Sequence, residues 1–171
     1  KPTARALLAA FQAAATKCGA RGEQRLQRTS IAGMIDAIAG EARLKDFSVL
    51  PIKSNDSFSE KLVERLLFET GRPVLMCPEA SADSLDTVFK EIAIAWDHTA
   101  PAARAVGDAL PLLKDAARVR IVTATDRATD AQRASGAELR RHLVEHGIHA
   151  QLDTIRIAGS SVGKVFGAYV D

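Results

Sequence analysis

Hydrophobic and polar positions along the chain follow two periods in turn, and they predict alternating helices and strands. In the first half, the predicted helices cover residues 4–17, 31–40 and 58–70, and the predicted strands cover residues 23–28, 47–52 and 74–77. The last two strands are short apolar runs, which is typical of strands buried on both faces. The strand at 23–28 is the weakest of the three predictions, and Pro51 is expected to end the strand that contains it.

The same order of elements starts again after a polar stretch. Residues 78–88 (PEASADSLDTV) are small and polar and indicate a linker. Beyond them, the predicted strands cover residues 89–96, 119–123 and 150–157, and the predicted helices cover residues 100–115, 130–146 and a segment that opens at Ser160 or Ser161. This alternation predicts an α/β fold: a doubly wound, Rossmann-like parallel sheet with helices on both faces.

The ends of the predicted helices carry the residues that usually start and stop helices. Ser30 and Ser57 are expected N-caps, because a serine hydroxyl can accept a hydrogen bond from a free backbone N–H of the first turn. Gly71 and Gly147 are expected to end helices, and Pro101 falls in a first turn, where proline is tolerated.

Composition narrows the class of protein. Of 171 residues, 47% are hydrophobic and 26% are charged, so the chain can bury a core, and a net charge of +2 without a dense basic stripe argues against nucleic-acid binding. The apolar stretches fall far short of the roughly 20 residues that span a bilayer. Cys18 and Cys77 lie far apart in the sequence, so we expect each to be a free thiol that is buried or half-buried. Free thiols are typical of the reducing cytosol, so we expect a cytoplasmic location.

Two stretches resemble known sequence patterns. Phe89–Asp97 (FKEIAIAWD), followed by HTAPAARAV, looks like the opening of a universal stress protein domain, in which the first strand ends in an aspartate before a helix rich in small residues. Leu62–Pro78 (LVERLLFETGRPVLMCP) looks like the close of such a domain. The matching residues are Glu64, Arg65, Leu66, Leu67, Pro73, Val74, Leu75 and Pro78 in the closing stretch, and Asp97, Ala102 and Ala105 in the opening one.

A closing piece followed by an opening piece implies the tandem form of the universal stress family, with the adenine nucleotide alpha hydrolase-like fold. We expect residues 1–78 to be the later part of one unit, 79–88 the linker and 89–171 the earlier part of a second unit. The chain starts without methionine and stops directly after a helix-like segment, so we expect both ends to lie inside a longer protein. The resemblance further implies a homodimer, or pairing of the two units, through the strand Val74–Cys77.

The resemblance also implies an ATP site in the second unit. Ligands of doubly wound sheets bind at the carboxyl ends of the strands, so the candidate residues are Asp97, His98, Thr99, Thr123 and Ala124. Asp97 has two readings: it contacts the adenine region of the nucleotide, as in ATP-binding relatives, or it caps the following helix together with Thr99. The glycine-rich phosphate motif of this unit is expected beyond Asp171.

The first unit lacks the corresponding glycine-rich turn. The stretch Lys53–Lys61 (KSNDSFSEK) contains no glycine, and a phosphate cradle needs backbone amides that no side chain covers. Asp56 and Glu60 would repel phosphate. We therefore expect no ATP in the first unit.

Other motifs favour structural roles. Gly159–Lys164 (GSSVGK) has one residue fewer between its glycines than a P-loop and Val165 after the lysine, which predicts a capped helix start. His142 and His146 are one helical turn apart but lack a third metal ligand. The sequence contains no recognisable set of catalytic residues, so we expect that the protein is not an enzyme. Three hypotheses stay open: a nucleotide-binding stress protein, a nucleotide-free scaffold of the same fold, and an enzyme of a related nucleotide-binding class.

Overall fold

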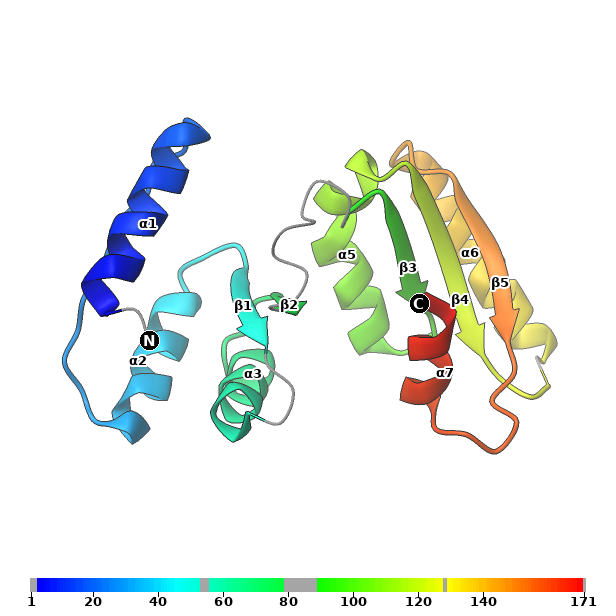
Figure 1. The fold of residues 1–171 in the computed structure, drawn as a ribbon. Coiled ribbons are helices and arrows are strands. Elements are labelled where there is room, and N and C mark those ends of the chain that lie inside the picture. Colours follow the sequence, from blue (N-terminus) through cyan, green and yellow to red (C-terminus); the bar gives the residue numbers. More distant parts are fainter. Residues whose placement is uncertain (1–2, 53–55, 79–88, 128, 171) are drawn as a thin grey trace.

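The computed structural model describes residues 3–52, 56–78, 89–127 and 129–170, with only the backbone at residues 31 and 32. The first half contains α1 (Ala4–Lys17), α2 (Ile31–Ala42), β1 (Ser48–Ile52), α3 (Ser57–Glu69) and β2 (Val74–Pro78) (Figure 1). The second half contains β3 (Glu91–Ala95), α5 (Ala100–Asp115), β4 (Arg118–Ala124), α6 (Asp130–Glu145), β5 (Ala150–Ile155) and α7 (Val162–Val170).

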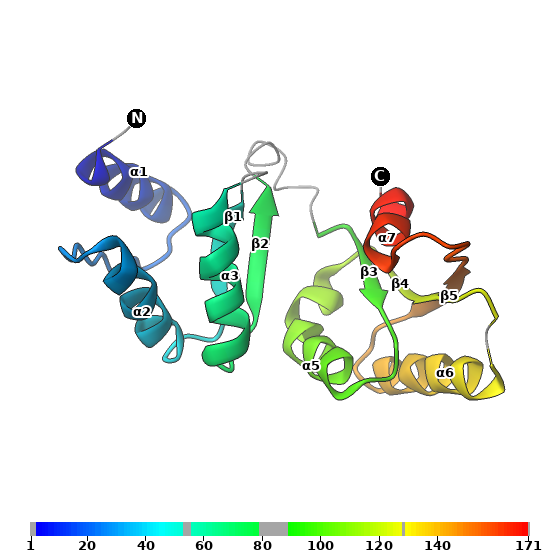
Figure 2. The ribbon, with the colours of Figure 1, turned by 90° about the horizontal axis from the view of Figure 1, so that it is seen from below.

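The strands form two parallel sheets, which confirms the predicted α/β fold. β1 pairs with β2 in one sheet, and β3, β4 and β5 lie side by side in that order in the other. In the three-stranded sheet, α5 and α6 cover one face and α7 lies on the other (Figure 2). The linker predicted at 79–88 lies outside the described residues.

Side-chain caps start the helices close to the predicted positions. Ser30 Oγ accepts a hydrogen bond from Gly33 N, and Thr129 forms a reciprocal capping box with Gln132 at the start of α6. The cap of α3 is Asp56 rather than the predicted Ser57, because the carboxylate of Asp56 accepts from the backbone N–H of Phe58. Gly71 and Gly147 follow α3 and α6 with φ of 68° and 78°, the left-handed conformation that only glycine adopts without strain.

Each half has its own apolar core. In the second half, α5 and α6 pack against β3 and β4 through nine buried residues: Ile94, Trp96, Val106, Leu113, Val119, Ile121, Leu139, Leu143 and Ile148. In the first half, the buried set is smaller: Ala39, Ala42, Leu62 and Leu66. The second half therefore holds the better-packed scaffold for a site.

The strand predicted at residues 23–28 is wrong. The segment runs without a ladder beside α1, where the amide of Gln24 donates to the carbonyl of Leu8 and to Gln12 Oε1. Leu26 is its one apolar side chain and is 64% exposed. A segment this polar gains little from burial in a sheet, so local hydrogen bonds decide its conformation.

β1 and β2 are less buried than predicted. Val49 and Met76 are about half exposed, and Phe47, the first residue of the predicted strand 47–52, is similarly exposed. A two-stranded sheet has only edge strands, and this one packs on α2 and α3 through Leu50 and Val74, so its other surfaces meet solvent.

Pro51 lies inside β1 rather than at its end. Ser48 N donates to Pro73 O, so alternate residues of β1, starting with Ser48, direct their backbone groups toward β2. Pro51 falls in the other set, and its nitrogen faces the open edge. A residue without an N–H is tolerated there because no ladder hydrogen bond is lost.

Candidate functional site

The carboxyl ends of β3, β4 and β5 meet at one edge of the three-stranded sheet, where three loops begin. Two hydrogen bonds join the end of β5 and its following loop to the loop after β4. Thr125 N donates to Ile155 O at 2.9 Å, and Ala158 N donates to Asp126 Oδ1 at 2.7 Å. This edge is where parallel α/β sheets bind ligands.

Two residues of this edge have a left-handed backbone without being glycine. His98 follows β3 with φ of 64°, and Ala158 follows β5 with φ of 48°. Among the described residues, these are the non-glycine residues with positive φ. Such conformations cost of order 1 kcal/mol and concentrate at ligand sites. Both strained positions lie at the same sheet edge.

Asp97 holds the N-cap residue of α5 in this structure. Its Oδ1 accepts hydrogen bonds from Thr99 Oγ1 at 2.7 Å and from Thr99 N at 3.0 Å, and Thr99 in turn caps α5 at Ala102. The Thr99 hydroxyl, followed by its amide, lowers the pKa of Asp97. Thr99 is thus the N-cap of α5 and Asp97 holds its side chain and amide, while the contact of Asp97 with a nucleotide stays a prediction.

The five predicted site residues do not converge on one cavity. Asp97, His98 and Thr99 are exposed in the turn between β3 and α5. Thr123 lines a cavity of about 270 Å³ between α6 and the sheet, together with Gln132, Arg133, Gly136 and Leu152. Ala124 is the next residue of β4, so its side chain points to the opposite face of the sheet.

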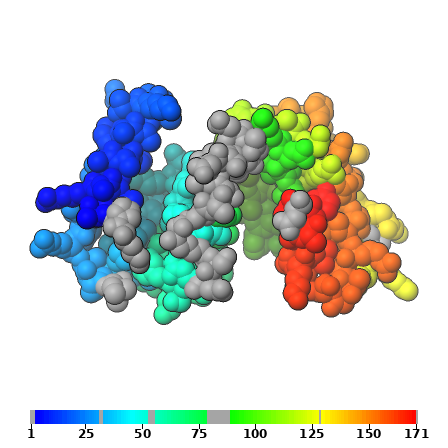
Figure 3. All heavy atoms as spheres, in the orientation of Figure 1, coloured from blue at the N-terminus to red at the C-terminus, as the bar shows by residue number. Residues whose placement is uncertain are grey.

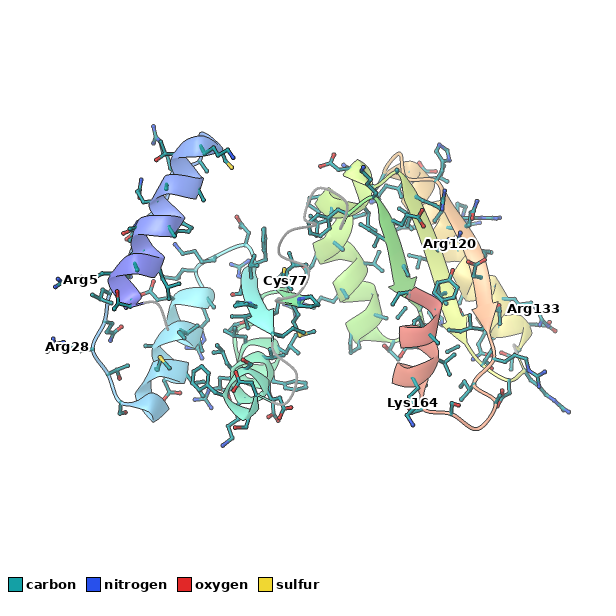
Figure 4. The ribbon with its side chains drawn as sticks, viewed as in Figure 1. Arg5, Arg28, Cys77, Arg120, Arg133 and Lys164 are labelled. Atoms are coloured by element: carbon teal, nitrogen blue, oxygen red, sulfur yellow. The ribbon has the colours of Figure 1, made fainter. Side chains whose placement is uncertain are left out.

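A second cavity, widely open to solvent, lies between the carboxyl end of β5 and α7. Its volume is about 400 Å³, and its lining residues are Ile155, Arg156, Ile157, Ala158, Ser160, Lys164, Val165, Ala168 and Tyr169. Lys164 extends from the amino end of α7 (Figure 4). Arg156 and Lys164 give this cavity two exposed cations.

The sequence pattern singled out Lys164 but not Arg156. The predicted helix start at Gly159–Lys164 is confirmed: α7 begins at Val162, and Ser161 Oγ accepts from Lys164 N at 3.4 Å. Arg156 carries no motif of its own. Only the path of the chain between β5 and α7 brings it to the same cavity as Lys164, which sequence spacing alone does not reveal.

A polar cluster connects α7 to the sheet. Arg120 Nη1 on β4 lies 3.0 Å from Asp153 Oδ2 on β5 and donates to the Tyr169 hydroxyl at 3.4 Å. Tyr169 on α7 also donates to Asp153. The Tyr169 hydroxyl and then Arg120 lower the pKa of Asp153, and burial followed by Asp153 raises the pKa of Tyr169. This half-buried cluster positions α7 against the strands.

Histidines and cysteines offer no assembled metal or redox centre in the part of the chain that the structure describes. His142 and His146 pack edge to face with ring centroids 4.8 Å apart, and no group of three or more metal-ligating side chains gathers there. Cys77 is half-buried, whereas Cys18 is exposed, contrary to prediction, because it follows the last turn of α1. Of the described helices, none has the length and apolar character to cross a membrane.

Comparison with known proteins identifies no relative. No protein-family model matches the chain, and it has no match among curated proteins or solved structures. The resemblance to universal stress proteins therefore rests on the two stretches of sequence that carry it.

Proposed function

We propose that this protein is a non-catalytic stress-response module of the universal stress type that binds ATP at the carboxyl edge of β3, β4 and β5. The observation that carries the proposal is the pair of left-handed residues, His98 and Ala158, at that single edge. Backbone strain of this kind persists where the surrounding structure fixes it, and strained residues cluster at active sites, ligand clamps and switch regions.

The chemistry of the edge suits an anionic ligand. Arg156 and Lys164 lie at one side of it and supply positive charge for phosphate groups. On the other side, the Asp97–Thr99 turn leads into α5 and is the place that the resemblance implies for the adenine ring. The free thiols of Cys18 and Cys77 support the cytoplasm as its location.

Titration calorimetry with MgATP on the 171-residue chain tests this proposal. We expect saturable binding, weakened about tenfold or more by Asp97→Ala and by the double variant Arg156→Glu/Lys164→Glu. Arg140→Glu is the matched control, since this exposed arginine of α6 lies outside the residues that line either cavity. Absence of binding up to millimolar MgATP, or equal affinity in all four proteins, would refute the ATP site.

A nucleotide-free scaffold is the second candidate, and specific observations favour it. Asp97 Oδ1 is already engaged by Thr99, and the first half exposes several large apolar side chains: Leu7, Phe11, Phe47, Val49, Phe68 and Met76. Such residues suit protein contacts, including a homodimer or pairing of the two units through β2. Sedimentation of the chain across a range of concentrations tests self-association. A monomer at every concentration would exclude the homodimer.

A further inference from the structure

Helix α7 is held more weakly than the other helices of the second half. None of its nine residues is buried, whereas α5 and α6 each bury residues in the core. The helix lies at the surface of the molecule, on the face of the sheet opposite α5 and α6 (Figures 2 and 3). Elements with few buried apolar contacts are the ones that open locally in folded proteins.

The chain leading into α7 has the backbone of a hinge. Ala158 and Gly159 are consecutive left-handed residues with φ of 48° and 76°. Both are exposed, and an alanine side chain at position 159 would meet no atom within 4 Å. No side chain packs against Gly159, so the helix is free to turn at this residue, while the hydrogen bond from Ala158 N to Asp126 Oδ1 holds the preceding side of the hinge in place.

At its other end, α7 is fastened by one polar cluster. Tyr169 donates to Asp153 and accepts from Arg120, which joins the last turn of the helix to β5 and β4. Arg120 and Val122 are alternate residues of β4 and point to the same face, on which α7 lies. Val122 is fully buried on that face, so the closed position of the helix also covers an apolar residue.

The cavity of about 400 Å³ lies between these two points. Its lining residues come from the β5–α7 loop and from α7 itself, including Lys164, Val165, Ala168 and Tyr169. A swing of α7 would thus open or close this cavity along its length.

We propose that α7 is a hinged lid over this cavity, with Ala158–Gly159 as its hinge and the contacts of Tyr169 with Asp153 and Arg120 as its latch. The lid follows from how the helix is held and does not depend on the identity of any ligand. Its opening is local, and β3, β4 and β5 stay paired while it occurs.

Amide hydrogen exchange on the intact chain tests the lid. Tyr169→Phe removes the latch hydroxyl and keeps the ring, so we expect amides of Val165–Val170 to exchange about tenfold faster while those of β4 change less than about twofold. Asp153→Asn should give the same pattern. Val170→Thr, an exposed change in the same helix that leaves the latch intact, should give the exchange rates of the original chain.

Two results would overturn the proposal. Unchanged exchange of α7 in both latch variants would mean that Tyr169 does not hold the helix. Equal acceleration in α7 and β4 would mean that the cluster stabilises the whole fold and that α7 does not open by itself. Neither result bears on ATP binding, which calorimetry measures separately.

Discussion

The indole Nε1 of Trp96 donates a hydrogen bond of 2.9 Å to Oγ of Ser135 inside the core of the second half. The two residues are 39 positions apart, and the bond joins the end of β3 to α6. Ser135 is 4% exposed, so neither partner can exchange the other for water.

Ser135→Ala leaves the indole N–H buried without an acceptor. We expect the free energy of unfolding to fall by about 1–3 kcal/mol, the usual cost of an unpaired buried polar group. Urea denaturation followed by the fluorescence of Trp96, the single tryptophan, measures it.

Ser160→Ala is the control for this change, because Ser160 is exposed in the loop before α7. Its effect should stay within about 0.5 kcal/mol. If both variants lose a similar free energy of unfolding, the Trp96–Ser135 hydrogen bond does not contribute more to stability than an exposed serine does.

The same substitution should have opposite effects at two glycines. Neither Gly107 nor Gly147 has an atom within 4 Å of an added methyl group, so only backbone conformation separates them. Gly107→Ala within α5 should stabilise the protein by about 0.5–1 kcal/mol. Gly147→Ala should destabilise it by about 1–2 kcal/mol, because φ is 78° at this position. Thermal unfolding of both variants decides the signs.

Backbone strain at His98 can be separated from its imidazole. His98→Gly removes the left-handed penalty and should raise the free energy of unfolding by up to about 1 kcal/mol, whereas His98→Ala keeps the penalty and should not. If the ring contacts the nucleotide, both variants lose ATP affinity in calorimetry. A glycine variant no more stable than the alanine variant would contradict strain at this turn.

Asp153 should make stability depend on pH in the acid range. Its pKa is lowered by Tyr169 and Arg120, so its contribution is present above the unfolded-state pKa of about 4 and is lost as pH falls through the folded-state value. At neutral pH, the urea midpoint of Asp153→Asn should lie below that of the original chain. The difference between the two midpoints should shrink below about pH 4.

Asp130→Asn is the matched control for that measurement. Asp130 also pairs with an arginine, Arg133, but its side chain is 99% exposed, so water screens the pair. We therefore expect Asp130→Asn and the original chain to have similar urea midpoints at every pH. A constant gap between the original chain and Asp153→Asn down to the most acid condition would contradict the assignment.

Most of the fold was predictable because local signals and burial agree. Pro101 and Gly147 predicted where α5 begins and α6 ends, alternating apolar residues predicted β3, and a continuous apolar run predicted β4. Prediction failed where strand pairing decides the structure. The segment at 23–28 has no neighbouring strand to pair with, and β1 and β2 are half exposed because their sheet has only two strands.

The candidate site was predictable only as an edge of the sheet. The general rule for parallel sheets placed Asp97 and Thr123 at carboxyl ends of strands, where both lie. The pattern of hydrophobic and polar residues does not predict in which direction these side chains point or which path the loops take. Thr123 lines the cavity beside α6, and Arg156 and Lys164 line one cavity only because of the path of the chain between β5 and α7. The left-handed backbone of Ala158 has no sequence signal, since alanine rarely adopts it.

The proline in β1 has a consequence for how the protein behaves at high concentration. An open strand edge can recruit strands from other molecules and seed fibrous aggregates. Because Pro51 presents no N–H at the outer edge of β1, an incoming strand finds a donor missing in the middle of the ladder it would form. The small sheet of the first half is thereby protected against growth on that side, although its apolar residues are half exposed.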